Sequence, residues 1–241
     1  MRLFKSTPQD YYDSPMSDFP LLIRALVWVV MAILFAFSKL MWRWSVEDAD
    51  KLLKRGKTGV VIICNHTSMA EVVSIVTFLY FSGHRVRPIF KSEFAKARIV
   101  EWAFSRVGGI PVDRGTSDMK ALRRAQHALK QGEDILIFPE GTRIRSDDQQ
   151  SSVHGGFALI AQMAKAPVAP LAVCGFRDIT PLGKRFMRPR TCWIKAGDQL
   201  LLDSAPADLK RKERLAWFEN LSWSCVLELR KSLRSKHPGR F

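Results

Sequence analysis

Residues 60–71 of the chain read VVIICNHTSMAE. The five residues at its start are uncharged and mostly β-branched, which is typical of a short strand buried on both faces of a sheet. The polar part that follows contains a histidine and a carboxylate, His66 and Glu71. Ser68 between them can cap a helix. A buried strand that turns directly into a helix predicts an α/β fold.

The same alternation of short apolar runs with longer mixed stretches continues toward the C-terminus. Further strands are expected at 86–90, 135–138, 168–173 and 192–196, and helices over 117–131 and 208–236. Thr116 or Ser117 can cap the first of these helices, and Gly132 can end it. Pro170 predicts that its strand lies at a sheet edge or carries a bulge, because proline cannot donate a ladder hydrogen bond. Residues 57–241 are therefore expected to form one α/β domain, a mostly parallel mixed sheet flanked by helices.

The N-terminal segment, residues 1–56, is dominated by an apolar stretch from Leu21 to Trp42. Its uncharged part, Ala25 to Phe37, has thirteen residues, whereas a membrane crossing needs about 20. Three interpretations remain open: a buried core helix, a helix lying in the membrane surface, and a single span. Both membrane interpretations place the rest of the chain beside lipid.

Charge and composition restrict the partners. The chain has 241 residues, a net charge of +15 and 47% hydrophobic residues, so an anionic partner is expected for a folded protein. No nucleic-acid-binding motif is present, and the apolar N-terminal segment favours membrane lipids over nucleic acid. The four cysteines form no C-x-x-C pair and the five histidines are scattered; reduced core thiols and no metal site are therefore expected.

His66 and Glu71 are the first candidate catalytic pair. If His66 lies in the turn after the strand, a carboxylate in the first turn of the helix can reach its Nδ1, which leaves Nε2 free to accept a proton. A structural alternative uses the same residues. Ser68 and Glu71 also fit the capping box S-x-x-E, in which the glutamate bonds backbone instead of histidine.

Two further fragments contain arginines in turns. Phe138 to Arg143 follows a strand, and its last residue offers a forked donor suited to phosphate; an ordinary loop with an ion pair is the alternative. Residues 108–115, GGIPVDRG, place Arg114 in a glycine-bounded turn, for which the alternative is a hairpin or a loop with an Asp–Arg pair.

Taken together, these fragments resemble the four motifs of the glycerolipid acyltransferase superfamily, in particular the 1-acylglycerol-3-phosphate O-acyltransferase family. The resemblance spans about residues 58–175. The matching positions, motif by motif, are Asn65, His66 and the carboxylate at 71; Gly109, Ile110, Val112 and Arg114; Phe138 to Arg143; and Val168 to Pro170. Lys91 falls where the family often has a lysine.

The resemblance implies an enzyme that transfers a fatty acyl group to the free hydroxyl of 1-acylglycerol-3-phosphate, giving phosphatidic acid. The donor would be acyl-CoA or acyl carrier protein as co-substrate, with no further cofactor. His66 and Glu71 would be catalytic, and Lys91, Arg114, Glu140, Gly141, Thr142 and Arg143 would bind the acceptor. The expected partner is an anionic membrane surface, at the cytoplasmic face of the cell membrane. A different lysolipid acceptor, or a non-catalytic membrane-binding homologue, remains open.

One residue departs from the family pattern, which usually has aspartate where this chain has Glu71. The extra methylene moves the carboxylate by about 1.5 Å unless the backbone adjusts, and a misplacement of about 1 Å can cost roughly 100-fold in rate. An adapted dyad, a slower enzyme and a weakened homologue are all compatible with glutamate. We favour the adapted dyad because the other motifs are intact.

Overall fold

The structure is a computed structural model that describes residues 7–113, 118–149, 152–181, 183–184, 186–206 and 208–240. Its centre is a seven-stranded sheet in the order β1-β7-β6-β2-β5-β3-β4. The strands are β1 (Ser45–Glu47), β2 (Val61–Cys64), β3 (Val86–Lys91), β4 (Ile110–Val112), β5 (Asp134–Ile137), β6 (Val168–Cys174) and β7 (Trp193–Ala196). The helices are α1 (Pro8–Tyr12), α2 (Leu21–Trp42), α3 (Ala49–Leu53), α4 (Met69–Phe81), α5 (Arg98–Arg106), α6 (Met119–Lys130), α7 (Gly156–Ala164) and α8 (Arg211–Lys236).

Five of the strands run in the same direction. β2 is parallel to both β5 and β6, and β3 is parallel to both β4 and β5. β7 is antiparallel to β6, and β1 pairs with β7 in parallel. The predicted mostly parallel mixed sheet is therefore confirmed, and the C-terminal ends of β2 to β6 all meet at one edge.

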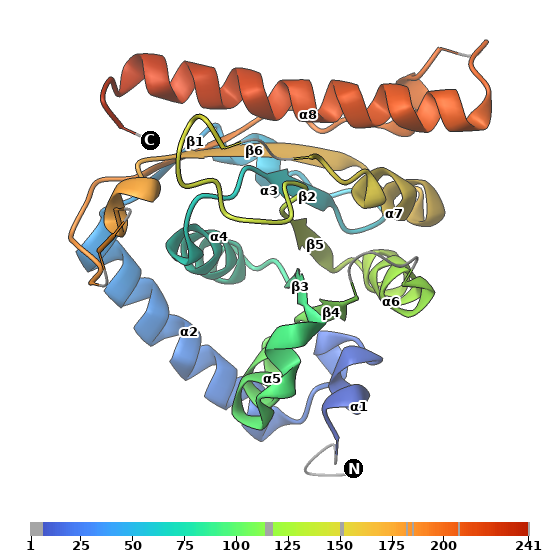
Figure 1. Ribbon diagram of the computed structural model, residues 1–241. Coiled ribbons are helices and arrows are strands. Elements are labelled where there is room, and N and C mark those ends of the chain that lie inside the picture. The colour runs from blue at the N-terminus through green and yellow to red at the C-terminus, as the bar shows by residue number, and fades with distance from the viewer. Residues whose placement is uncertain are drawn as a thin grey trace.

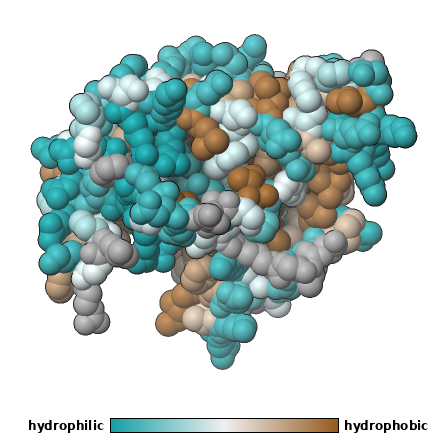
Figure 2. All heavy atoms as spheres, turned by 45° about the horizontal axis from the view of Figure 1, so that its top comes forward, coloured by the Kyte–Doolittle hydropathy of each residue, from teal (hydrophilic) through white to brown (hydrophobic). Residues whose placement is uncertain are grey.

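Helices cover both faces of the sheet (Figure 1). Ile62 and Cys64 of β2 belong to the core cluster that contains α2 and α4. Val61 and Ile63, which alternate with them, belong to the cluster that contains α6, α7 and α8. Because a strand directs successive side chains to opposite faces, one apolar run supplies both cores. The side that carries α8 is mostly hydrophilic, with hydrophobic residues in separate patches (Figure 2).

Helix α2 is divided lengthwise into a buried and an exposed side. The buried positions are Ile23, Val27, Met31, Ser38 and Trp42. The large hydrophobic residues on the exposed side are Leu21, Leu22, Leu26, Trp28, Val29, Val30, Ile33, Phe37 and Leu40. Edge-on ring contacts from Trp28 and Phe35 to Phe81 attach the helix to α4. By length and composition it could cross a membrane, yet one side of it packs on the domain from end to end.

Two details differ, wholly or in part, from the sequence-based expectations. Of the two alternatives for Pro170, a sheet edge is wrong, because β6 lies inside the sheet between β7 and β2. A bulge fits, because residues 169–170 of β6 lie opposite residues 197–199 between the pairs Leu171–Ala196 and Val168–Leu200. The fold accommodates it because paired residues of β6 and β7 end at Leu171 and Ala196, and the Pro170 carbonyl still accepts a hydrogen bond from Gly197. The proposed caps Thr116 and Ser117 lie outside the described residues, and the N-cap of α6 is Asp118, whose side chain accepts from two backbone N–H groups.

The N-terminal segment also contributes to the sheet. β1 lies within residues 1–56 and pairs with β7. β4 occupies 110–112, where only a turn was expected. Both strands have three residues, which is too short for a periodic pattern in the sequence. The four cysteines are free thiols, and Cys64, Cys174 and Cys192 are buried as expected.

Candidate active site

The motif residues gather at one edge of the sheet because their strands are parallel. Asn65 and His66 follow β2, Lys91 ends β3, and Glu140 lies in the loop after β5. In open α/β sheets ligands bind outside the carboxyl ends of the strands. The fold therefore brings fragments that are far apart in the sequence to the edge where a ligand is expected.

His66 is held by Glu71. The Nδ1 of His66 lies 2.6 Å from Oε1 of Glu71, whose side chain is fully buried at 0% exposure, while that of His66 retains 14%. Glu71 also accepts hydrogen bonds from the Thr67 backbone N–H at 2.7 Å, the Thr67 hydroxyl at 2.7 Å and the Ser68 N–H at 2.9 Å. A carboxylate that meets this many donors is fixed in place. It directs the Nδ1 proton of His66 inward and leaves Nε2 as the acceptor.

Both of the contacts predicted for Glu71 are present in the structure. Ser68 and Glu71 form the capping box at the start of α4. Oε1 meets the His66 ring, and Oε2 meets the Ser68 N–H. A single carboxylate can serve both groups because it has two oxygens and about four acceptor positions. The longer side chain of glutamate reaches both partners from the first helical turn.

Neighbouring strands fix the backbone of His66. Asn65, which is buried, accepts a hydrogen bond from the Val173 N–H at 2.9 Å and donates one to the Val173 carbonyl at 3.3 Å. The His66 carbonyl accepts from the Ile144 N–H at 2.7 Å. The imidazole stacks on Phe138, with ring centroids 4.3 Å apart and planes inclined by 30°. The histidine is thus positioned from β6, the loop after β5 and α4 together.

Glu140 lies behind the histidine. A hydrogen bond of 3.0 Å from the Gly141 N–H to the Phe138 carbonyl closes a tight turn around it. Gly141 has φ 67°, which glycine adopts without strain. The turn directs the Glu140 carboxylate inward, where Oε2 accepts a hydrogen bond of 2.5 Å from the His66 backbone N–H.

The environment of Glu140 favours its protonated form. Burial raises the pKa of Glu140 from 4.5 to about 7, and the neighbouring Glu71 raises it as well. The His66 N–H, Arg230 and the His66 ring act in the opposite direction. Glu140 therefore changes charge within the physiological pH range, beside the backbone of the candidate base.

The predicted acceptor-binding residues differ in how far they are buried. Lys91 is half-buried at the end of β3, and Thr142 and Arg143 are exposed in the loop after β5. The Arg143 carbonyl accepts a hydrogen bond of 3.1 Å from the Gln149 side chain, which braces this part of the loop. Arg114 lies outside the described residues. Lys91 and Arg143 thus lie at the same sheet edge as His66, Arg143 exposed and Lys91 half-buried.

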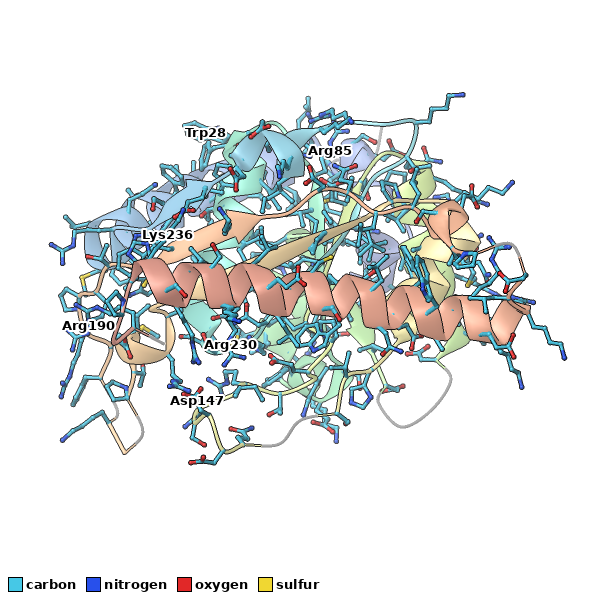
Figure 3. All side chains as sticks on the ribbon, turned by 90° about the horizontal axis from the view of Figure 1, so that it is seen from above. Trp28, Arg85, Asp147, Arg190, Arg230 and Lys236 are labelled. Atoms are coloured by element: carbon cyan, nitrogen blue, oxygen red, sulfur yellow. The ribbon has the colours of Figure 1, made fainter. Side chains whose placement is uncertain are left out.

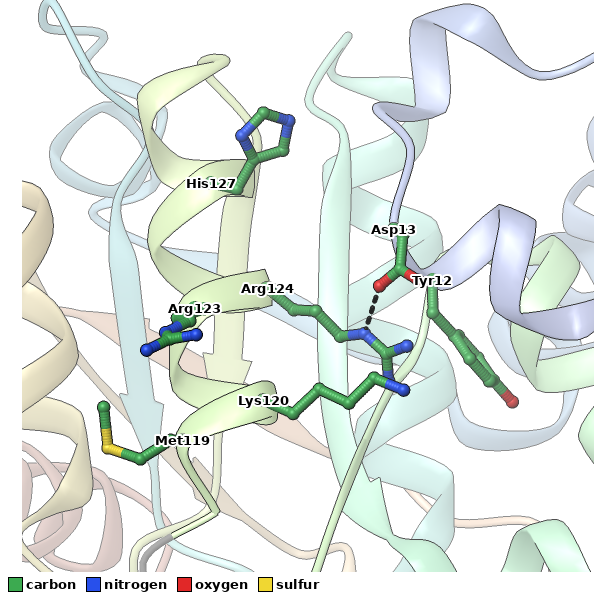
Figure 4. A pocket seen from close by; sticks show the side chains of 7 residues that line it. All are labelled: Tyr12, Asp13, Met119, Lys120, Arg123, Arg124 and His127. Atoms are coloured by element: carbon green, nitrogen blue, oxygen red, sulfur yellow. Dashed lines mark hydrogen bonds and ion pairs between the residues drawn. The ribbon is translucent and has the colours of Figure 1, made fainter.

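Two other features do not belong to this site. A depression of about 530 Å³ lies between α1 and α6, and none of the predicted site residues lines it (Figure 4). An ion pair of 2.6 Å between Arg124 and Asp13 attaches α1 there. Cys64 immediately precedes Asn65, but burial raises the pKa of its thiol well above the usual value. A buried thiol of this kind remains protonated and cannot act as a nucleophile.

Comparison with known proteins agrees with this arrangement. Residues 43–174 match the family described as Acyltransferase. The chain belongs to this family. The matched region contains His66, Glu71 and Glu140, whereas α8 lies beyond it.

Similar family members carry one recurring name. A 1-acyl-sn-glycerol-3-phosphate acyltransferase of Bacillus subtilis (strain 168) is 30% identical over 72% of this chain and 82% of its own length. The alpha form of Mus musculus is 28% identical over 67% of this chain and 59% of its own length. A chloroplastic member of Arabidopsis thaliana is 28% identical over 66% of this chain, and the match spans only 42% of the Arabidopsis protein.

A solved structure shares the fold. The 1-acyl-sn-glycerophosphate acyltransferase PlsC of Thermotoga maritima superposes with a TM-score of 0.62, covering 83% of this chain and 79% of that one at 24% sequence identity.

Sequence reasoning missed contacts that are made across long separations. The stacking of Phe138 on His66 joins positions 72 apart in the chain, and Arg230 from α8 influences Glu140 electrostatically. No pattern in the neighbouring sequence indicates either contact. The hydrogen bonds of Asn65 could have been predicted, because an amide side chain that directly follows a buried strand needs partners once it is buried.

Proposed function

We propose that this protein transfers a fatty acyl group from an acyl thioester to the free hydroxyl of 1-acylglycerol-3-phosphate, forming phosphatidic acid. The observation that carries the proposal is the 2.6 Å contact between His66 and the fully buried Glu71. The names of the similar family members support the choice of acceptor.

In the proposed reaction His66 is the general base. Nε2 takes the proton of the acceptor hydroxyl while that oxygen attacks the thioester carbonyl. The resulting tetrahedral intermediate collapses to the ester and expels the thiolate, to which the imidazolium returns the proton. Glu71 stabilises the imidazolium formed in between, as the carboxylate does in Ser-His-Asp triads. The chain's own residues therefore account for the proton at every stage.

Cationic groups would hold the acceptor phosphate. We assign this role to Lys91, Arg114 and Arg143, of which Arg143 is exposed and Lys91 half-buried at the same sheet edge as His66. A guanidinium binds phosphate through two parallel hydrogen bonds, which gives direction as well as charge. Glu140, together with Gly141 and Thr142, would position the glycerol part of the acceptor, through the turn that they form beside His66.

We also propose that α2 lies in the membrane surface with its exposed hydrophobic side toward lipid, on the cytoplasmic face of the cell membrane. A lying helix is favoured over a span because one side of α2 is buried from Ile23 to Trp42 and ring contacts to Phe81 attach it to α4, so that a crossing would draw α4 toward the bilayer. Helix α8 covers the opposite face of the sheet. Its basic residues would therefore face away from the lipid that α2 contacts.

The experiment that tests the proposal is a panel of acceptors with two labelled donors, acyl-CoA and acyl carrier protein. The full chain, supplied with phospholipid vesicles, is given 1-acylglycerol-3-phosphate, the phosphate-free 1-acylglycerol and lysophosphatidylcholine. Labelled phosphatidic acid is the expected product, with little transfer to the phosphate-free acceptor. Transfer only to another lysolipid would change the acceptor, and no transfer to any of them would refute the enzymatic proposal.

A further inference from the structure

Three arginines converge on one carboxylate next to the active-site loop. Oδ1 of Asp147 lies 2.9 Å from Arg234, 3.1 Å from Arg177 and 3.4 Å from Arg230. Arg230 and Arg234 come from α8, and Arg177 follows β6. Asp147 belongs to the loop between β5 and α7, the same loop that carries Glu140 and Arg143. Figure 3 shows Arg230 extending from α8 toward Asp147.

We infer that Asp147, Arg177, Arg230 and Arg234 form a charge clasp that positions the loop after β5 against His66. The inference rests on the proposed acyltransferase function and adds positioning residues to it. The clasp acts through other groups, because its residues bond the loop and none of them contacts His66. Its three arginines lie outside the matched family region, which ends at residue 174.

Residues 140–147 of this loop are attached at both ends. On the active-site side the Ile144 N–H donates to the His66 carbonyl at 2.7 Å, and Glu140 accepts from the His66 N–H. On the outer side Asp147 meets the three arginines. Residues 140 to 147 thus connect His66 at one end with α8 at the other. Loosening the outer attachment would allow the exposed Arg143 and the buried Glu140 to move relative to His66.

The charges in the clasp do not balance. Three guanidinium groups surround one carboxylate, and burial lowers the pKa of the half-buried Arg230 together with repulsion from Arg234. Glu140 is the other carboxyl group that Arg230 influences favourably. The groups that act on the pKa of Glu140 are the His66 N–H and ring, Glu71 and Arg230, of which Arg230 comes from α8. Arg230 therefore connects the clasp electrostatically to the residue that supports the His66 backbone.

The test compares Asp147→Asn, which removes the charge, with Asp147→Glu, which retains it, in the full chain. We expect Asp147→Asn to lower kcat/KM for 1-acylglycerol-3-phosphate roughly tenfold, since sub-ångström displacement of site groups is costly. Hydrogen–deuterium exchange in residues 138–149 should rise in the same variant. Asp147→Glu should keep both kcat/KM and the exchange of residues 138–149 close to the wild-type values. The matched control is Lys236→Gln, which removes a 2.7 Å ion pair from α8 to Glu47 on the other side of α8 from Asp147 (Figure 3).

A second variant separates positioning from a general loss of structure. Arg230→Gln should move the titration midpoint of the Glu140 carboxyl band, followed by infrared spectroscopy, to higher pH, and Arg230→Lys should restore it. Unchanged exchange in 138–149 with Asp147→Asn, or an equal effect from Lys236→Gln, would overturn the clasp. The exchange and infrared measurements do not require catalysis, so they remain decisive even if no acyl transfer is found.

Discussion

Shortening Glu71 to aspartate is the perturbation for which the structure gives the clearest magnitude. Removing one methylene withdraws the carboxylate by about 1.5 Å if the backbone of α4 stays in place. The contact with His66 Nδ1, now 2.6 Å, would lengthen to about 4 Å, beyond the range of a hydrogen bond. A misplaced catalytic group costs up to about 100-fold in rate, equivalent to roughly 2.7 kcal/mol of transition-state stabilisation. We therefore expect Glu71→Asp to be slower, although aspartate is usual in the family.

The assay is the initial rate of labelled acyl transfer at pH 7, normalised to folded protein. The loss should appear in kcat, with KM for the acceptor little changed, because Glu71 contacts His66, Thr67 and Ser68 and lies fully buried. Thermal unfolding should show a cost of about 1 kcal/mol from the weakened cap. Glu228→Asp, at an exposed position of α8, is the control and should change neither property. An equal or faster rate for Glu71→Asp would refute the role assigned to the 2.6 Å contact.

Three further predictions concern stability and membrane binding. The pKa of Glu140 is raised in the folded state, so its contribution to stability is present below pH 4.5 and lost as pH rises through about 7. The rise in pKa corresponds to roughly 3 kcal/mol at about 1.4 kcal/mol per pH unit. Glu140→Gln keeps an acceptor for the His66 N–H and should make the free energy of unfolding, measured with denaturant, less dependent on pH between pH 5 and 8. Asn65→Ala should cost roughly 3 kcal/mol by leaving the buried Val173 N–H and carbonyl unpaired. Ile33→Glu should weaken sedimentation with anionic vesicles severalfold, since it places a charge on the exposed side of α2.

Each of these has an outcome that would count against it. An identical pH dependence with and without the Glu140 carboxyl would mean that it is not the group with the raised pKa. A loss below 0.5 kcal/mol for Asn65→Ala would mean that water replaces the amide. For membrane binding the matched control is Leu227→Glu on α8, where leucine is 43% exposed compared with 63% for Ile33. Equal weakening by both substitutions would argue against a lipid contact specific to α2.

The central strands and the order of the motifs could be predicted because each has a local signal. Continuous apolar runs identify buried parallel strands, and a residue that follows such a strand must lie at the sheet edge. The sequence could not decide the contacts of Glu71, because the capping box and the His66 contact both use a glutamate at this one position. Only the structure shows that each carboxylate oxygen meets a different partner. The ion pairs of the Asp147 clasp could not be predicted from the sequence, for another reason. They join α8 to a loop more than 80 positions earlier, and α8 has no pattern that indicates which of its arginines face that loop.

The orientation of α2 illustrates a similar limit. The sequence identifies an apolar helix, but hydrophobic residues occur on all sides of it. Contact with the rest of the core, including α4, decides which of them are buried, and this contact depends on the packing of the whole domain. The alternation of buried and exposed positions therefore appears only in the folded chain.

The central claim is that His66 removes the proton from the acceptor hydroxyl. The most direct measurement is the rate of phosphatidic acid formation by His66→Ala and by the wild type, with labelled acyl thioester and 1-acylglycerol-3-phosphate, on protein whose unfolding transition is unchanged. Loss of a general base lowers the rate by about 10²- to 10⁴-fold, and we expect a loss in this range in kcat. Retention of more than about half of the wild-type rate would contradict the assignment.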